Sequence, residues 1–160
     1  MHHPLMGDPP AMPNEHRGTR DADAVQRTLL SRAACLELLT HAHLGRLILS
    51  IDCLPAARPV LLALIDDAVI AAIGPGPEVD AVERGDVVAL EIDGTQEGGQ
   101  GTWSVRVTGA AERVTWDESL SQQLASTELA PLLSTETPLL KLSLDLLDGE
   151  RTSYGIPAAP

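Results

Sequence analysis

Short aliphatic runs that end at turn residues recur along most of this chain, and they constrain the fold more than any other feature. The runs fall at residues 44–51, 58–65, 68–73, 87–92, 102–114 and 139–146. Their Val, Ile and Leu content, and the period-two alternation of the last two runs, are typical of β-strands rather than helices. The sequence therefore predicts six strands.

The segments between the runs predict short helices and tight turns. A helix is expected from the capping hydroxyl of Ser31 to about Leu39, a second over 78–84 that ends at Gly85, and a third after Asp117. Two adjacent acids at 66–67 suit a two-residue hairpin turn, and Pro55-Ala56-Ala57 is expected to form another turn.

Strands joined as hairpins leave exposed edges unless the sheet closes on itself. We therefore expect a mainly β (α+β) fold, a six-stranded antiparallel barrel with a few short helices. With 160 residues the chain has the size of one domain. Residues 1–24 lack hydrophobic periodicity and are predicted to be a disordered tail, which leaves 25–155 as the folded domain.

Charge and hydropathy exclude two classes of partner. The chain has 11 basic against 23 acidic side chains and a formal net charge of −12, which repels nucleic acid and anionic bilayers. No apolar run reaches the roughly 18 residues that a membrane span needs, and the N-terminus does not resemble a secretory signal. We expect a cytoplasmic protein that binds neither nucleic acid nor membrane.

The sequence contains no convincing metal or nucleophile motif. Cys35 and Cys53 are too few for a disulfide framework, and neither lies at metal-ligand spacing. His41 and His43 lack a third ligand at matched spacing, and no Ser, Cys or His stands in a nucleophile elbow. We therefore assign no metal ligand and no catalytic side chain.

Several short motifs in a fixed order suggest a family. They are Gly45-Arg46-Leu47, Arg58-Pro59-Val60, Gly74-Pro75-Gly76 before a short helix, and Trp103-Ser104-Val105 on a long strand. In this order the chain resembles the pyridoxamine 5′-phosphate oxidase-like family of flavin-binding split β-barrels. The likeness covers roughly residues 29–152.

The resemblance implies a flavin-dependent oxidoreductase that forms a homodimer, with flavin mononucleotide (FMN) in each of two clefts at the subunit interface. Some relatives use a deazaflavin in the same cleft, so a deazaflavin is the alternative cofactor. On the matching positions, Arg58, Pro59 and Val60 would bind along the flavin ring, and Trp103 and Ser104 would approach from the long strand. A purely packed role for Trp103 is the competing interpretation.

The chain departs from the family where the flavin phosphate is held. Family members carry an aromatic-Arg-Thr run and then a Lys or Arg, whereas this chain has Ala71-Ala72-Ile73 followed by Pro77 and Glu78. A phosphate needs charge-assisted or clustered backbone donors, and a nearby carboxylate repels it. The replacements predict a degenerate phosphate site and weakened flavin binding.

Two functions therefore stay open at this stage. One is a flavin-dependent oxidoreductase, for which Arg46 and Arg58 are the available cations. The other is a non-catalytic dimeric module that has lost its flavin and binds a small apolar ligand or a protein partner. A cleft lined by the aliphatic residues Leu61, Leu62, Ala71, Ala72 and Ile73 would suit such an apolar ligand.

Overall fold

The computed structural model describes residues 25–133 and 136–154, so the predicted N-terminal tail lies outside the described residues. The strands are β1 (Gln26–Leu29), β2 (Leu44–Ile51), β3 (Leu54–Ile65), β4 (Ala68–Ala72), β5 (Val87–Thr95), β6 (Gly101–Ala110), β7 (Glu112–Arg113), β8 (Leu139–Ser143) and β9 (Leu146–Ser153). The helices are α1 (Arg32–Thr40), α2 (Pro77–Arg84) and α3 (Glu118–Leu124), with short 3₁₀ turns η2 (Glu97–Gly99) and η3 (Ala130–Leu132).

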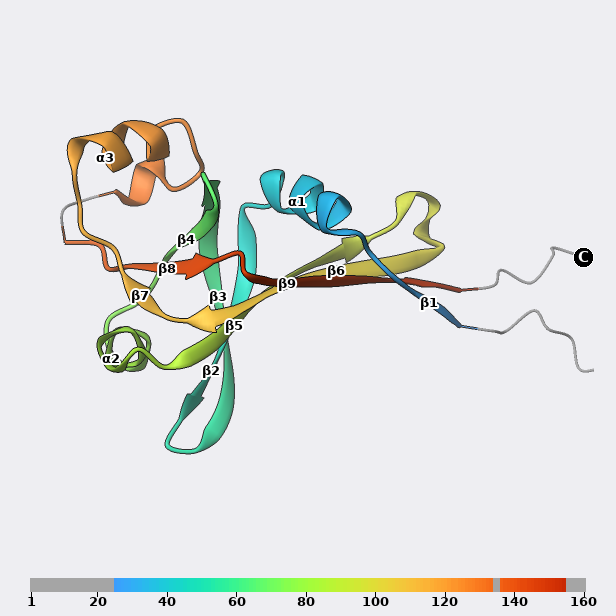
Figure 1. Ribbon diagram of the computed structural model, residues 1–160, viewed down its shortest axis with the longest axis horizontal. Coiled ribbons are helices and arrows are strands. Elements are labelled where there is room, and N and C mark those ends of the chain that lie inside the picture. The colour runs from blue at the N-terminus through green and yellow to red at the C-terminus, as the bar shows by residue number, and fades with distance from the viewer. Residues whose placement is uncertain (1–24, 134–135, 155–160) are drawn as a thin grey trace, which may run out of the picture.

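One antiparallel sheet closes into the barrel. Its strands pair in the order β1-β9-β6-β5-β2-β3-β4-β8-β7. Only Ala111 separates β6 from β7, yet β6 pairs with β5 and β9 while β7 pairs with β8 at the other end of the order. Residues 101–113 therefore close the barrel, and the paired β6, β9 and β1 extend beyond it as an arm (Figure 1).

The predicted fold class is confirmed, and each of the six predicted strand segments contributes to the barrel wall. The sheet has nine strands rather than six, because the predicted strand at 102–114 forms both β6 and β7, and β1 and β9 were missed. All four residues of β1 are exposed, so it carries no aliphatic pattern. The predicted last strand at 139–146 is wrong in its length, because the chain bends after Ser143 and β9 begins at Leu146.

The first hairpin turn also differs from the prediction. Asp52 and Cys53 both have positive φ and form the turn, so Pro55-Ala56-Ala57 belongs to β3. This two-residue turn has the twist that suits antiparallel strands. Proline is tolerated there because the first half of β3 pairs with β2 alone, which leaves its other edge without a ladder.

The helices begin and end where the local signals predict. Ser31 accepts a hydrogen bond from the backbone N–H of Ala34 at the start of α1, and Asp117 accepts one from Leu120 at the start of α3. Gly85 ends α2 in the left-handed conformation, with φ of 66°. Among the described residues, no helix has the length and apolar character needed to cross a membrane.

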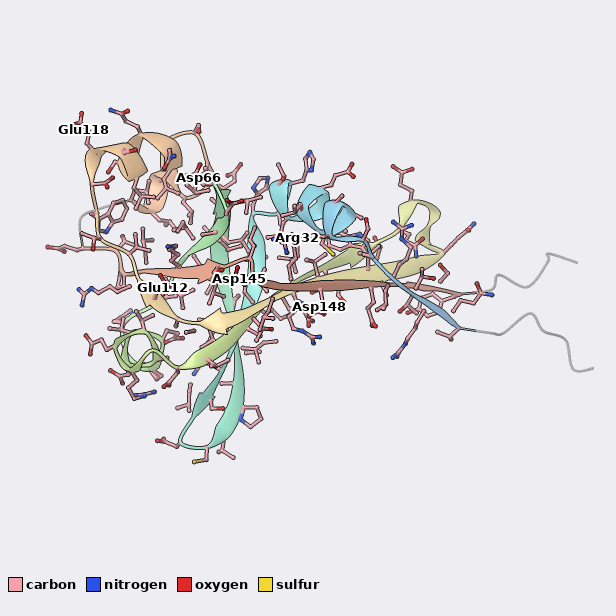
Figure 2. All side chains as sticks on the ribbon, in the orientation of Figure 1. Arg32, Asp66, Glu112, Glu118, Asp145 and Asp148 are labelled. Carbon is pink, nitrogen blue, oxygen red and sulfur yellow. The ribbon has the colours of Figure 1, made fainter. Side chains whose placement is uncertain are left out.

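Two hydrophobic clusters share the barrel wall. The larger fills the barrel and reaches α1, through side chains such as Leu39, Leu62 and Leu90. The smaller lies on the outer side of β3, β4 and β8, where Ile70 and Leu139 pack beneath Leu124 of α3. Figure 1 shows α3 at this end of the molecule, and Figure 2 shows Asp66 and Glu118 there.

Candidate functional site

The strand register divides the predicted cofactor-binding residues between two faces of the sheet. Pro59 pairs with Arg46, and Ser104 pairs with Asp93, so Pro59 and Ser104 lie on the outer face. Val60 belongs to the core cluster and therefore points inward. The β3 and β6 positions are separated by β2 and β5, about 14 Å across the sheet. Within one chain they do not form a single pocket.

Trp103 packs over a glycine on the neighbouring strand. It pairs with Gly94, and a Cβ added to Gly94 would lie 2.6 Å from the Trp103 ring. The ring is partly buried and also contacts the core cluster. These contacts are those of a packed aromatic, and they explain why position 94 requires glycine. A role for Trp103 in binding a cofactor stays a prediction.

Arg58 forms an ion pair with Glu78. Glu78 stands where the family resemblance implies a Lys or Arg that binds the flavin phosphate, and we call this place the phosphate corner. The Arg58 Nε lies 3.5 Å from the Glu78 carboxylate. The Glu78 side chain is only 11% exposed and lies in the first turn of α2, whereas the Arg58 side chain is 52% exposed. The pair neutralises much of the positive charge that an anionic ligand would meet at this corner.

The aliphatic residues of the predicted apolar cleft pack mainly inside the two hydrophobic clusters. Leu62 and Ala71 are both 0% exposed and Ile73 is 5% exposed, all within the core cluster. Leu61 and Ala72 pack against the smaller cluster on the α3 side. Within the single chain the two clusters use these five side chains, so a cleft lined by them at a subunit interface stays a prediction.

The outer face of β2, β5, β6 and β9 carries a row of charged residues that the sequence reasoning missed. The register aligns Arg46, Glu91, Arg106 and Asp148 across four strands, next to Pro59. Arg46 pairs with Asp93, and Arg106 pairs with Asp148 at 2.9 Å. The signal was the polar alternation of Glu91 and Asp93 on the fourth predicted strand.

Two shallow recesses lie along this outer face. One is bounded by Leu44, Arg46, Pro59 and Asp93, and the other by Leu29, Ser104 and Arg106 together with the acids of β5 and β9. Arg46 lies next to Pro59, and its guanidinium is already paired with the Asp93 carboxylate. Both recesses are open to solvent, so a second surface would be needed to enclose a ligand there.

The one thiol in the core is protected from ionisation. Cys35 is 1% exposed, and its Sγ lies close to the backbone of Gly149. Burial, and secondly the negative charge of Asp148, raises the pKa of the Cys35 thiol. Cys53 is exposed at the β2–β3 turn. Among the described residues, no group of three or more His, Cys, Asp and Glu side chains could hold a metal ion.

Solved structures share this split-barrel fold. A FAD-binding protein from Mesorhizobium loti aligns with a TM-score of 0.69 and 21% identity, over 81% of this chain and 99% of that one. A FAD-binding protein from Mycobacterium smegmatis aligns with a TM-score of 0.57 and 21% identity, over 79% and 98%. A FAD- and heme-binding protein from the same organism gives 0.61 and 19%, over 84% and 76%.

The family follows from the sequence itself. The pyridoxamine 5′-phosphate oxidase family model matches residues 31–143, so the chain belongs to this family. The match spans α1 to β8 and includes Arg58, Glu78 and Trp103. Among curated proteins, none matches the sequence.

Proposed function

We propose that this chain is a flavin-binding redox protein that holds its cofactor mainly by the isoalloxazine ring and only weakly by the phosphate. Family membership and the likeness to FAD-binding split barrels support flavin as the ligand. The single observation that carries the weak phosphate grip is the Arg58–Glu78 ion pair. When bound, the flavin would supply the hydride or electron-transfer chemistry.

The residues at the phosphate corner fit a flavin only in part. Arg58 could bind one phosphate oxygen, but its guanidinium already faces the Glu78 carboxylate at 3.5 Å. The neighbouring Ala71 and Ile73 are buried and offer no polar side-chain atom. Each missing charge-assisted hydrogen bond weakens phosphate binding by about 1.5–3 kcal/mol. The phosphate therefore contributes little to affinity.

The test compares FMN with riboflavin, which differ only by the phosphate. FAD is titrated in parallel, since the similar solved structures are named as FAD-binding. We expect wild-type protein to bind FMN and riboflavin within about 3-fold of each other, as followed by quenching of flavin fluorescence. Glu78→Gln should tighten FMN by about 10-fold and leave riboflavin unchanged, because it frees Arg58.

Glu128→Gln is the matched control, since it removes an equal charge from an exposed position on the α3 side of the barrel. It should change neither affinity. Wild-type binding of FMN more than about 100-fold tighter than riboflavin would contradict the weak phosphate grip. Absence of binding for every flavin, in wild type and Glu78→Gln alike, would contradict flavin binding itself.

A second candidate function is a dimeric binding module without flavin, which the internally neutralised Arg58 also favours. Both functions include a homodimer. We propose that its contact is the outer face of β2, β5, β6 and β9, which carries charges of both signs and, at different places along the strands, the exposed Leu44 and Val87. Light scattering that finds only monomer at high micromolar concentration would overturn this.

A further inference from the structure

A separate cavity lies between α2 and the strand ends at β4, β7 and β8. It is partly open to solvent and has a volume of about 140 Å³. Six of its ten lining residues are apolar, namely Ile73 just after β4, Val79 and Val82 from α2, Val114 after β7, and Pro138 and Leu139 at the start of β8. The other four are Glu83, Arg113, Glu136 and Thr137. An apolar cavity of about 150 Å³ is large enough to hold benzene. The cavity therefore has room for one small ring or a branched aliphatic group.

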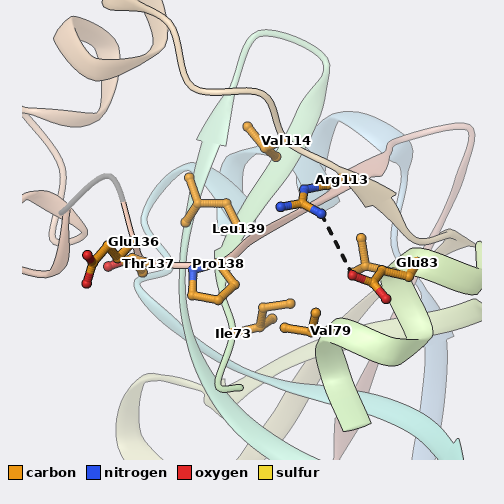
Figure 3. A pocket seen from close by; sticks show the side chains of 10 residues that line it. Ile73, Val79, Glu83, Arg113, Val114, Glu136, Thr137, Pro138 and Leu139 are labelled. Carbon is orange, nitrogen blue, oxygen red and sulfur yellow. Dashed lines mark ion pairs between the residues drawn. The ribbon is translucent and has the colours of Figure 1, made fainter. Parts of the chain in front are cut away.

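A cation and an acid face each other across its opening. Arg113 of β7 lies 3.8 Å from Glu83 of α2, and Figure 3 shows this pair on one side of the cavity. Their side chains are 77% and 57% exposed, and such solvated pairs contribute roughly 0–1 kcal/mol. Glu136 lies on the opposite side in Figure 3, away from the guanidinium. Arg113 can therefore exchange Glu83 for another carboxylate.

We propose that this cavity binds a small carboxylate with an apolar body, such as an aromatic or branched aliphatic acid. The apolar group would lie against Val79, Val82 and Leu139, where it removes aliphatic surface from water. The carboxylate would take two N–H donors from the planar guanidinium of Arg113. Glu83 lowers the affinity because it competes for the same donors.

The proposed site is distinct from the Arg58–Glu78 corner. Neither of those two residues lines the cavity, although Glu78 is on the same helix. One lining residue, Ile73, also belongs to the run Ala71-Ala72-Ile73 that replaces the phosphate-binding residues of the family. Because Arg58 and Glu78 do not line the cavity, saturating FMN should leave binding in the cavity unchanged.

Benzoate is the probe, and benzyl alcohol and benzylamine are its neutral and cationic counterparts. Each is titrated into ¹⁵N-labelled full-length protein while the amide resonances are followed. We expect benzoate to shift the amides of Ile73, Val79 and Val82 with a dissociation constant on the order of 1 mM. Benzylamine and benzyl alcohol should bind more weakly.

Three variants test the roles of the residues. Arg113→Gln should weaken benzoate at least 10-fold without changing benzyl alcohol, and Glu83→Gln should tighten benzoate about 3-fold or more. Both positions are exposed, so these variants should fold normally. Val79→Phe fills the apolar space and should abolish binding of all three probes.

Several results would overturn the proposal. Benzylamine binding more tightly than benzoate would make Glu83 the recognition group. Benzoate binding that is unchanged in Arg113→Gln would exclude the guanidinium contact, and unshifted amides at 73, 79 and 82 would exclude the cavity. Displacement of benzoate by FMN would assign its binding to the flavin site.

Discussion

The two halves of the barrel wall differ in what covers their outer faces. On β4, the inward Val69 is 0% exposed and the outward Ile70 is only 4% exposed, because α3 and its flanking segment pack over the strand. On β2, the inward Leu47 is 0% exposed, but the outward residues include the exposed Leu44 and Arg46. One half is thus buried on both faces and the other on one.

This difference indicates where an external surface can act. The chain itself closes the outer side of β3, β4 and β8, so their aliphatic side chains serve the fold. The outer side of β2, β5, β6 and β9 retains charge pairs and exposed aliphatic groups, next to Pro59 and Ser104. The predictions below test whether this contrast is as strong as the burial suggests.

The largest effect is expected from a matched pair of isoleucines on the outer face. Ile70→Ala removes a side chain buried beneath α3 and should lower the free energy of unfolding by about 3 kcal/mol. Ile48→Ala removes a half-buried side chain from the uncovered half and should lower it by about 1 kcal/mol or less. Urea unfolding of both variants measures the difference. Equal losses would mean that another surface covers β2 in solution.

A smaller effect is expected where β6 and β9 approach closely in the arm. A Cβ added to Gly101 would lie 2.1 Å from the carbonyl oxygen of Thr152, so the strands would have to separate. Gly101→Ala should lower the free energy of unfolding by about 2 kcal/mol. Gly74→Ala is the control, because its added Cβ meets nothing within 4 Å. Equal unfolding midpoints for the two variants would show that β6 and β9 can separate at Gly101 without loss of stability.

The pH dependence of the free energy of unfolding tests the burial of the core thiol, and the exposed thiol of the β2–β3 hairpin serves for comparison. Folding raises the pKa of the Cys35 thiol above its ordinary value of 9.0, so the neutral thiol is favoured in the folded protein. Its contribution to stability is complete below pH 9 and is lost as the pH rises through the folded pKa. Between pH 8 and 10, wild type should lose stability more steeply than Cys35→Ala under reducing conditions.

Cys53→Ala is the control that removes a thiol outside the core, at the exposed β2–β3 turn. Equal slopes of stability against pH in wild type and Cys35→Ala would contradict the prediction. Chemical denaturation at several pH values measures all three proteins.

The smallest effect is expected from the charged row itself. Arg106 and Asp148 are 49% and 58% exposed, so their ion pair is well solvated. Arg106→Gln should change the free energy of unfolding by less than about 0.5 kcal/mol. If this face forms the dimer contact, the same variant should instead weaken association, which light scattering over a dilution series would detect. A loss of more than about 1 kcal/mol in the free energy of unfolding of the monomer would contradict the interpretation that the Arg106–Asp148 ion pair is well solvated.

Local signals were enough to predict much of this architecture. Ser31 and Asp117 start their helices, and Gly85 ends α2, because capping and a left-handed C-terminus depend on a few adjacent residues. The aliphatic runs identified β2 to β6 and β8 because each of these strands buries at least one face. The turn at 55–57 was wrong because proline suggests a break unless the strand edge is known to be unpaired.

Long-range pairing was beyond the reach of the sequence pattern. The β1 strand has no buried residue, so only its pairing with β9 identifies it as a strand. The prediction singled out both Arg58 and Glu78, but their ion pair depends on how β3 passes the start of α2. The charged row likewise forms only when four strands align in register. Alternation along one strand does not reveal its neighbours.

The pairing of β1 with β9 has a consequence for how the chain folds. Gln26 pairs with Ser153, so the first described strand meets its partner only after nearly the whole domain has left the ribosome. Contacts so distant in sequence give a high contact order, which slows folding relative to helical proteins of similar length. Until β9 has been synthesised, β6 has only β5 as a partner, so one edge of β6 is exposed to pairing with other chains.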